Sequence, residues 1–200
     1  MEPLIDRARA FPQRVGDTGR ELTGLAAGQS PQALFITCSD SRVVPALITN
    51  ADPGDLFELR TAGNIVPVYR ADGASGETAT VEYAVEVLGV RDIVVCGHSH
   101  CGAVGAVVRG EDLSVVPAVR DWLRHADRAV LRADETEVFD PTVAGPVQRH
   151  VLAQLDRLRG YPAVARRLEE GRIRLRGWFY EIHTGLVLEH RADTGLFLPL

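Results

Sequence analysis

Ala33-Leu34-Phe35-Ile36-Thr37 and Asp92-Ile93-Val94-Val95-Cys96 are short, almost unbroken apolar runs, and they decide the fold of this chain. Such runs are typical of strands that are buried on both faces of a parallel sheet. Helical apolar spacing over 78–88, about 115–132 and 146–159 alternates with the strand patterns. Strands that alternate with helices predict an α/β fold, with a mostly parallel central sheet flanked by crossover helices.

Three further strands extend this sheet, and a polar segment precedes it. The predicted strands are Leu56–Arg60, Ile173–Tyr180 and Leu186–His190. Residues 1–30 are arginine-rich with scattered apolar positions, and we expect one or two helices that lie on a core without building it. No internal repeat or long linker divides the chain, so we expect a single domain over 1–200 with a helical arm over 1–30.

The composition excludes several classes of protein. The chain has 200 residues, of which 46% are hydrophobic and 24% are charged, so it can build one substantial core and is not expected to be disordered. The net charge of −5 argues against a nucleic-acid-binding surface. No apolar run reaches the roughly 20 residues that cross a bilayer, and the first residues do not resemble a secretory signal. We therefore expect a cytoplasmic protein without a membrane partner.

The three cysteines indicate a metal site better than a disulfide framework, because three is an odd and sparse number for this length. Cys38 and the pair His98 and Cys101 lie in two loops that each follow a buried strand. Ligands collect at the carboxyl ends of parallel strands, so the two loops can face one another. Two thiolates and one imidazole form a three-ligand zinc set that leaves the fourth tetrahedral position open. Cys96 lies within a strand and is expected to be a core residue.

Asp40 and Arg42 form a second informative pair, because an acid and an arginine two residues apart can share a bidentate hydrogen bond. The pair can simply order its loop. It can also control the metal: a carboxylate held by a guanidinium leaves the fourth position to water, and a released carboxylate is free to occupy it.

These loops resemble those of the β-class carbonic anhydrases. The similarity continues through several further motifs and covers most of the chain: Cys38–Arg42, Pro53–Phe57, Ala62–Asn64, Glu82–Val85, Gly97–Gly102 and Gly177–Gly185. The resemblance implies one Zn²⁺ per subunit on Cys38, His98 and Cys101, with Asp40 and Arg42 as catalytic residues beside it. It also implies a homodimer or larger assembly, with the N-terminal helices packed on a partner subunit. Residues that match the family's substrate pocket are Gln29, Phe57, Tyr83 and the backbone N–H of Gly102.

The activity that the resemblance implies is the reversible hydration of CO₂ to bicarbonate and a proton by zinc-bound hydroxide. Two alternatives stay open at this point. The same scaffold can hydrolyse a CO₂ analogue such as carbon disulfide, or the chain can be a zinc-bearing structural or bicarbonate-sensing protein without turnover.

Overall fold

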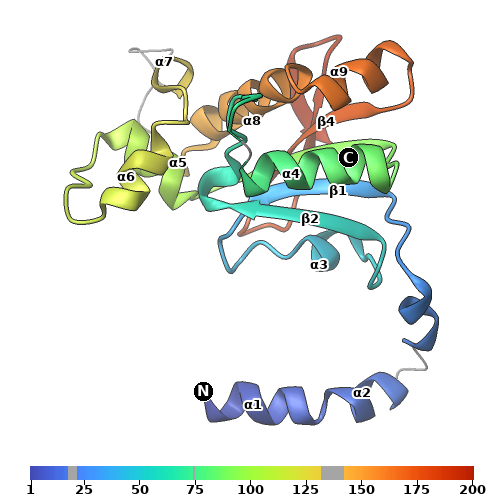
Figure 1. Cartoon of the computed structure of the whole chain (residues 1–200). Coiled ribbons are helices and arrows are strands. Elements are labelled where there is room, and N and C mark those ends of the chain that lie inside the picture. Colours follow the sequence, from blue (N-terminus) through green and yellow to red (C-terminus); the bar gives the residue numbers. More distant parts are fainter. Residues whose placement is uncertain (18–21, 74, 132–141) are drawn as a thin grey trace.

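A six-stranded sheet forms the centre of the computed structural model, which describes residues 1–17, 22–73, 75–131 and 142–200. Its strand order is β2-β1-β3-β4-β5-β6, in which the first four strands are parallel and the last two are antiparallel (Figure 1). The strands are β1 (Ala33–Cys38), β2 (Leu56–Thr61), β3 (Asp92–His98), β4 (Arg174–Tyr180), β5 (Val187–Arg191) and β6 (Leu196–Pro199). The predicted mostly parallel α/β sheet is confirmed, and β6 is a short strand that the sequence patterns missed.

Most helices follow the predicted patterns, with two exceptions. The expected helix over 115–132 is wrong as one unit: it is two short helices, and the Asp127 carboxylate accepts hydrogen bonds from Ala129 N (2.9 Å) and Val130 N (3.2 Å), which starts the second. The expected helix over 78–88 changes to a π-helical turn over Tyr83–Val87. The helices of the body are α3 (Pro45–Thr49), α4 (Gly76–Glu82), α5 (Gly102–Arg109), α6 (Pro117–Leu123), α7 (Arg128–Leu131), α8 (Ala144–Arg159) and α9 (Pro162–Glu169).

The main core lies between the sheet and the layer made by α4, α8 and α9 (Figure 1). Helix α8 approaches β3 very closely at Gly97, where an added Cβ would lie 2.4 Å from Val147 Cγ1 and 2.8 Å from Val151 Cγ2. A second apolar cluster lies at the carboxyl ends of β1 and β3, and it contains Cys38, Cys101 and residues of α5. The loops that carry the candidate ligands are therefore packed from several sides.

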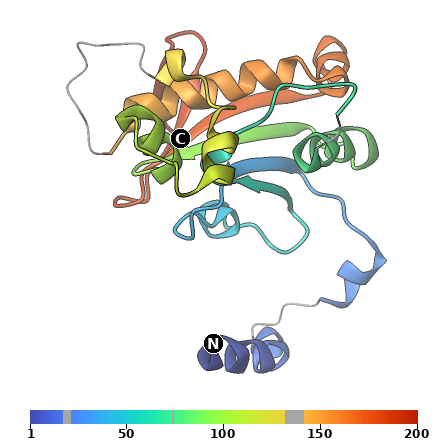
Figure 2. The same ribbon diagram turned by 60° about the vertical axis from the view of Figure 1, so that its left-hand side comes forward.

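The two N-terminal helices do not lie on the core of their own chain, so of the expectations for this segment only packing on a partner subunit stays open. Helices α1 (Glu2–Arg9) and α2 (Phe11–Asp17) contain no buried residue, and the arm extends away from the body; Figure 2 shows the same separation from another side. Leu4 and Phe11 keep 62% and 48% of their surface exposed. Nothing in the described part of this chain covers these apolar side chains.

Within the described residues, no helix is long and apolar enough to span a bilayer.

Candidate metal centre

Two adjacent parallel strands bring the three predicted ligands together. Cys38 is the last residue of β1 and His98 is the last residue of β3, so both side chains lie at the carboxyl edge of the sheet. Cys101 is the residue at which helix α5 begins. The expectation that the two loops face one another is confirmed.

The ligand atoms of Cys38, His98 and Cys101 all lie within 4.8 Å of one another. Ligand atoms around a tetrahedral Zn²⁺ are expected to lie about 3.5–3.8 Å apart, given Zn–S bonds near 2.3 Å and Zn–N bonds near 2.0 Å. The three side chains are almost completely removed from solvent, with exposed fractions of 6%, 0% and 1%. The arrangement fits one cation held by three side chains.

His98 shows the clearest sign that an electron-pair acceptor belongs here. Its Nδ1 lies 2.9 Å from the carbonyl oxygen of Ser99, which places the ring proton on Nδ1. Its Nε2 is buried and has no hydrogen-bond partner. Buried polar atoms are almost always paired, and metal-binding histidines use the second nitrogen in this way to fix the tautomer.

The thiols of Cys38 and Cys101 share a hydrogen bond. A hydrogen bond from Cys101 is the largest cause that lowers the pKa of Cys38, to about 4. The same contact, together with burial, raises the pKa of Cys101. Without a cation the pair therefore holds one proton, and a divalent cation displaces it when both sulfurs bind as thiolates.

One peptide group supports the Cys38 sulfur. The N–H of Gly63 donates to Cys38 Sγ over 3.3 Å, and the positive φ of 76° at Gly63 suits glycine. The carbonyl of that peptide, Ala62 O, accepts a hydrogen bond from the indole Nε1 of Trp122 at 2.9 Å. The indole thus polarises the peptide whose N–H points at the sulfur.

Helix α8 holds the same loop from the other side. His150 Nε2 lies 2.9 Å from Gly63 O, and Gln154 Oε1 accepts from Val66 N at 2.9 Å. Both side chains are buried. Burial lowers the pKa of His150 to about 4, so the ring is neutral at neutral pH.

Asp40 and Arg42 form the bidentate pair that their spacing predicts. Arg42 Nε donates to Asp40 Oδ1 at 2.9 Å and Nη2 donates to Oδ2 at 2.7 Å. This pairing holds the pKa of the Asp40 carboxyl well below its usual range. Asp40 Oδ2 lies 4.0 Å from His98 Nε2, and Arg42 Nη2 also donates to His100 O at 3.1 Å, so the pair joins the two loops.

The predicted pocket residues divide into two groups. Gly102 lies in the first turn of α5 with open space in front of its α-carbon. Gln29 is exposed before the amino end of β1, and Phe57 stands opposite Leu34 in the sheet, four residues before β2 ends. Tyr83 packs against Phe57 with ring centroids 5.9 Å apart. These three residues do not join the metal cluster of their own chain.

The residues outside the predicted site also have clear positions. Cys96 is a buried core residue, as its strand position predicts, and His100 is exposed.

Sequence reasoning missed Arg60, whose Nη2 donates to Asp40 O at 2.9 Å and to Val43 O at 2.7 Å and so shapes the first loop. It also missed Trp122 and His150. His150 lies on the apolar face of its helix next to Val147 and Val151, and a buried imidazole there signals a polar partner.

Comparison with known proteins agrees with this geometry. A family model described as carbonic anhydrase matches residues 33–187. The carbonic anhydrase of Pseudomonas aeruginosa is 53% identical over 190 residues, which cover 94% of this chain and 86% of the relative. The solved β-carbonic anhydrase CcaA superposes with a TM-score of 0.93 at 39% identity, covering 100% of this chain and 99% of its own. One of two tetrameric β-carbonic anhydrases of Sordaria macrospora matches with a TM-score of 0.79 at 29% identity, covering 94% of each chain. The chain therefore belongs to the β-carbonic anhydrases, a family of lyases.

Proposed function

We propose that this chain is a zinc enzyme that catalyses the reversible hydration of CO₂ to bicarbonate and a proton. The observation that carries the proposal is the buried set of two sulfurs and one imidazole, beside a carboxylate whose two oxygens both accept hydrogen bonds from Arg42. Soft thiolates with imidazole favour Zn²⁺ over the hard cations, which prefer oxygen.

Cys38, His98 and Cys101 would hold Zn²⁺, which would lower the pKa of a bound water to about 7 and so supply a nucleophile at neutral pH. Asp40 is ionised and fixed by two side-chain hydrogen bonds and one backbone hydrogen bond from Arg42, and it would accept a hydrogen bond from that water and orient it toward the carbon of CO₂. The free backbone N–H of Gly102 at the start of α5 donates to a substrate oxygen. Because Arg42 donates hydrogen bonds to both carboxylate oxygens, Asp40 would be held as a hydrogen-bond acceptor and not as a metal ligand.

The remaining pocket residues are proposed to act in a second subunit. Gln29, Phe57 and Tyr83 lie apart from the metal cluster of their own chain, and the exposed apolar side chains of α1 and α2 need a cover. We therefore propose a homodimer or larger homo-oligomer, in which the N-terminal helices pack on a partner. The tetrameric Sordaria proteins support this assignment. The cytoplasmic location stays a prediction.

Stopped-flow CO₂ hydration by zinc-loaded protein tests this function. We expect a rate far above buffer that disappears when Cys38 is replaced by serine. Carbon disulfide hydrolysis without CO₂ turnover would select the analogue hydrolase instead. A zinc-replete oligomer that turns over neither substrate would overturn the enzymatic function and leave a sensing or structural role.

A further inference from the structure

A second pocket, of about 430 Å³, lies at the end of the sheet opposite the metal centre. Three arginines line it: Arg91 just before β3, and Arg167 and Arg172 at the end of α9 and the turn after it. Strand β3 has seven residues, so its amino end lies about 20 Å from His98 at roughly 3.3 Å per residue. The pocket is thus separate from the site described above, and its size is in the range of small-molecule sites.

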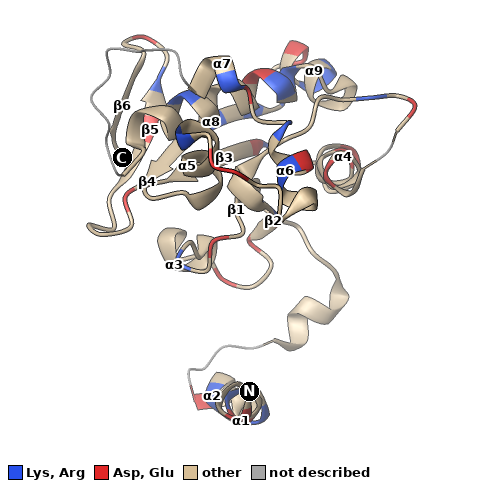
Figure 3. Ribbon diagram, turned by 90° about the vertical axis from the view of Figure 1, so that its left-hand side faces the viewer, with Lys and Arg blue, Asp and Glu red and all other residues tan. Residues whose placement is uncertain are grey.

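The pocket carries excess positive charge. Of the described residues that line it, none is acidic. Two carboxylates lie near: Glu86 pairs with Arg166 and Arg167, and Glu170 pairs with Arg167 and Arg172. Arg91 forms no ion pair within the described residues. Four guanidinium groups therefore face two carboxylates. Figure 3 shows basic and acidic segments side by side on α9.

The Nε–H group of Arg167 is buried and lacks a hydrogen-bond acceptor among the described residues. Its side chain is 18% exposed, and its Nε–H is buried without a hydrogen-bond partner. The carboxylates of Glu86 and Glu170 lie 3.6 Å and 3.8 Å from its terminal nitrogens, beyond hydrogen-bonding distance. A buried donor of this kind is almost always paired, so Arg167, which lines the pocket, has room for one more acceptor.

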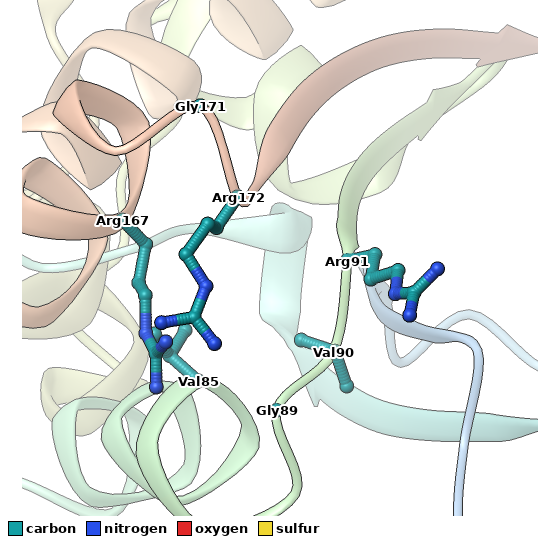
Figure 4. A pocket seen from close by; sticks show the side chains of 7 residues that line it. All are labelled: Val85, Gly89, Val90, Arg91, Arg167, Gly171 and Arg172. Atoms are coloured by element: carbon teal, nitrogen blue, oxygen red, sulfur yellow. The ribbon is translucent and has the colours of Figure 1, made fainter.

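Arg167 and Arg172 are arranged to share one ligand. Figure 4 shows the guanidinium groups of Arg167 and Arg172 side by side near Val85, whereas the Arg91 side chain lies beyond Val90 and points away from them. Glu170 lies 3.8 Å from Arg167 and 3.4 Å from Arg172, and one carboxylate offsets only one of these two positive charges, so the pair still attracts an anion. A tetrahedral oxyanion can accept from both planar groups and from Arg167 Nε, because it offers more acceptor oxygens than a carboxylate.

We propose that this pocket binds a dianionic oxyanion of the phosphate class, held by Arg167 and Arg172 with Arg91 at the rim. The ligand is either inorganic phosphate or the phosphate group of a small monoester. The site is independent of CO₂ hydration, so it stands whether or not the proposed activity is found.

Titration calorimetry on the full-length, metal-replete protein tests the proposal in a buffer free of phosphate and sulfate. The probes are inorganic phosphate and glycerol 3-phosphate. We expect one site per chain and a dissociation constant that rises at least about tenfold in Arg172→Gln, which removes one charge-assisted contact. Arg172 is 64% exposed, so this variant is expected to fold, and Arg167→Gln provides the second test. Arg159→Gln is the matched control, because among the described residues its exposed arginine forms an ion pair with Asp156 alone, at the end of α8.

The two probes separate the two sources. Equal affinity for the two probes shows that the pocket contacts the phosphate group alone. Tighter binding of the ester shows that the pocket also contacts the organic part. Both results support the site. An absence of binding at millimolar concentration would overturn it. Binding that Arg167→Gln and Arg172→Gln leave unchanged would overturn it as well, because the anion would then lie elsewhere.

Discussion

Cys38 and Cys96 lie on neighbouring strands, and both are buried, yet their environments are opposite. Cys96 is inside β3, where burial raises the pKa of its thiol to about 12 and the sulfur donates to Gly97 O at 3.5 Å. Cys38 is at the end of β1, where hydrogen-bond donors surround the sulfur and lower its pKa to about 4. Burial alone therefore makes an inert thiol. A ligand also needs the donors and the second thiol that only the end of the strand provides.

Removing one sulfur from each environment tests this contrast most strongly. Cys101→Ser is expected to lose its stoichiometric zinc and nearly all CO₂ hydration, because two protein ligands remain. Cys96→Ala is expected to keep one zinc per chain and lose only about 1 kcal/mol of stability from a small cavity. Metal analysis and chemical denaturation measure both. Loss of zinc in Cys96→Ala would break the comparison.

The Asp40–Arg42 pair is the next largest contribution. Asp40→Asn is expected to keep zinc and lower kcat/KM about 100- to 10,000-fold, because the amide does not act as an ionised proton acceptor. Asp72→Asn is a matched control, since Asp72 forms an exposed pair with Arg70 at the same spacing of two residues. Stopped-flow assays on both variants decide the question. Full activity in Asp40→Asn would show that the pair only orders its loop.

The indole of Trp122 sharpens the comparison between the two cysteines. It binds the peptide whose N–H donates to the Cys38 sulfur, and Cys96 has no such donor among the described residues. Trp122→Phe keeps a ring but removes the N–H that binds Ala62 O. We expect zinc to dissociate up to about tenfold faster into a chelator, as outer-shell changes at metal sites do. Trp178→Phe is the control, since its Nε1 contacts Glu189 at 3.4 Å instead. Equal zinc release from the two variants would remove Trp122 from the account.

Replacing His150 is expected to have the smallest effect of these changes at neutral pH. Its effect on the free energy of unfolding is clearest in acid. Burial lowers its pKa to about 4, whereas the unfolded chain binds this proton below about 6.5. Between these values the unfolded state holds more protons, so stability falls as pH drops from about 6.5 to about 4, by on the order of 3 kcal/mol. Urea unfolding at several pH values in this range gives the free energy of unfolding, which is expected to change less with pH in His150→Gln than in the wild type. The exposed His183→Gln is expected to keep the wild-type dependence on pH.

Much of the fold and the grouping of the three candidate metal ligands could be predicted from the sequence. The apolar runs at 33–37 and 92–96 specify buried parallel strands, and the carboxyl ends of adjacent parallel strands meet, which places Cys38 beside His98. Asp40 and Arg42 are near in sequence, so their pairing is a local property.

The features that were missed depend on contacts between distant segments. Trp122 reaches Ala62 across 60 positions and His150 reaches Gly63 across 87, and no local pattern encodes such pairs. The split at Asp127 was local and could have been found, because an aspartate that caps a new helix is a recognisable signal. Residues 1–30 were expected to lie on a core without building it, and sequence alone does not say which chain covers the exposed apolar side chains of α1 and α2.

X-ray absorption at the zinc edge of the loaded protein tests the central claim most directly. We expect two sulfur neighbours near 2.3 Å and one imidazole nitrogen near 2.0 Å, with one further light atom as the fourth neighbour. Three sulfur neighbours would mean that Cys96 joins the site, and fewer than two would mean that Cys38 and Cys101 do not share the metal. Either result would contradict the account.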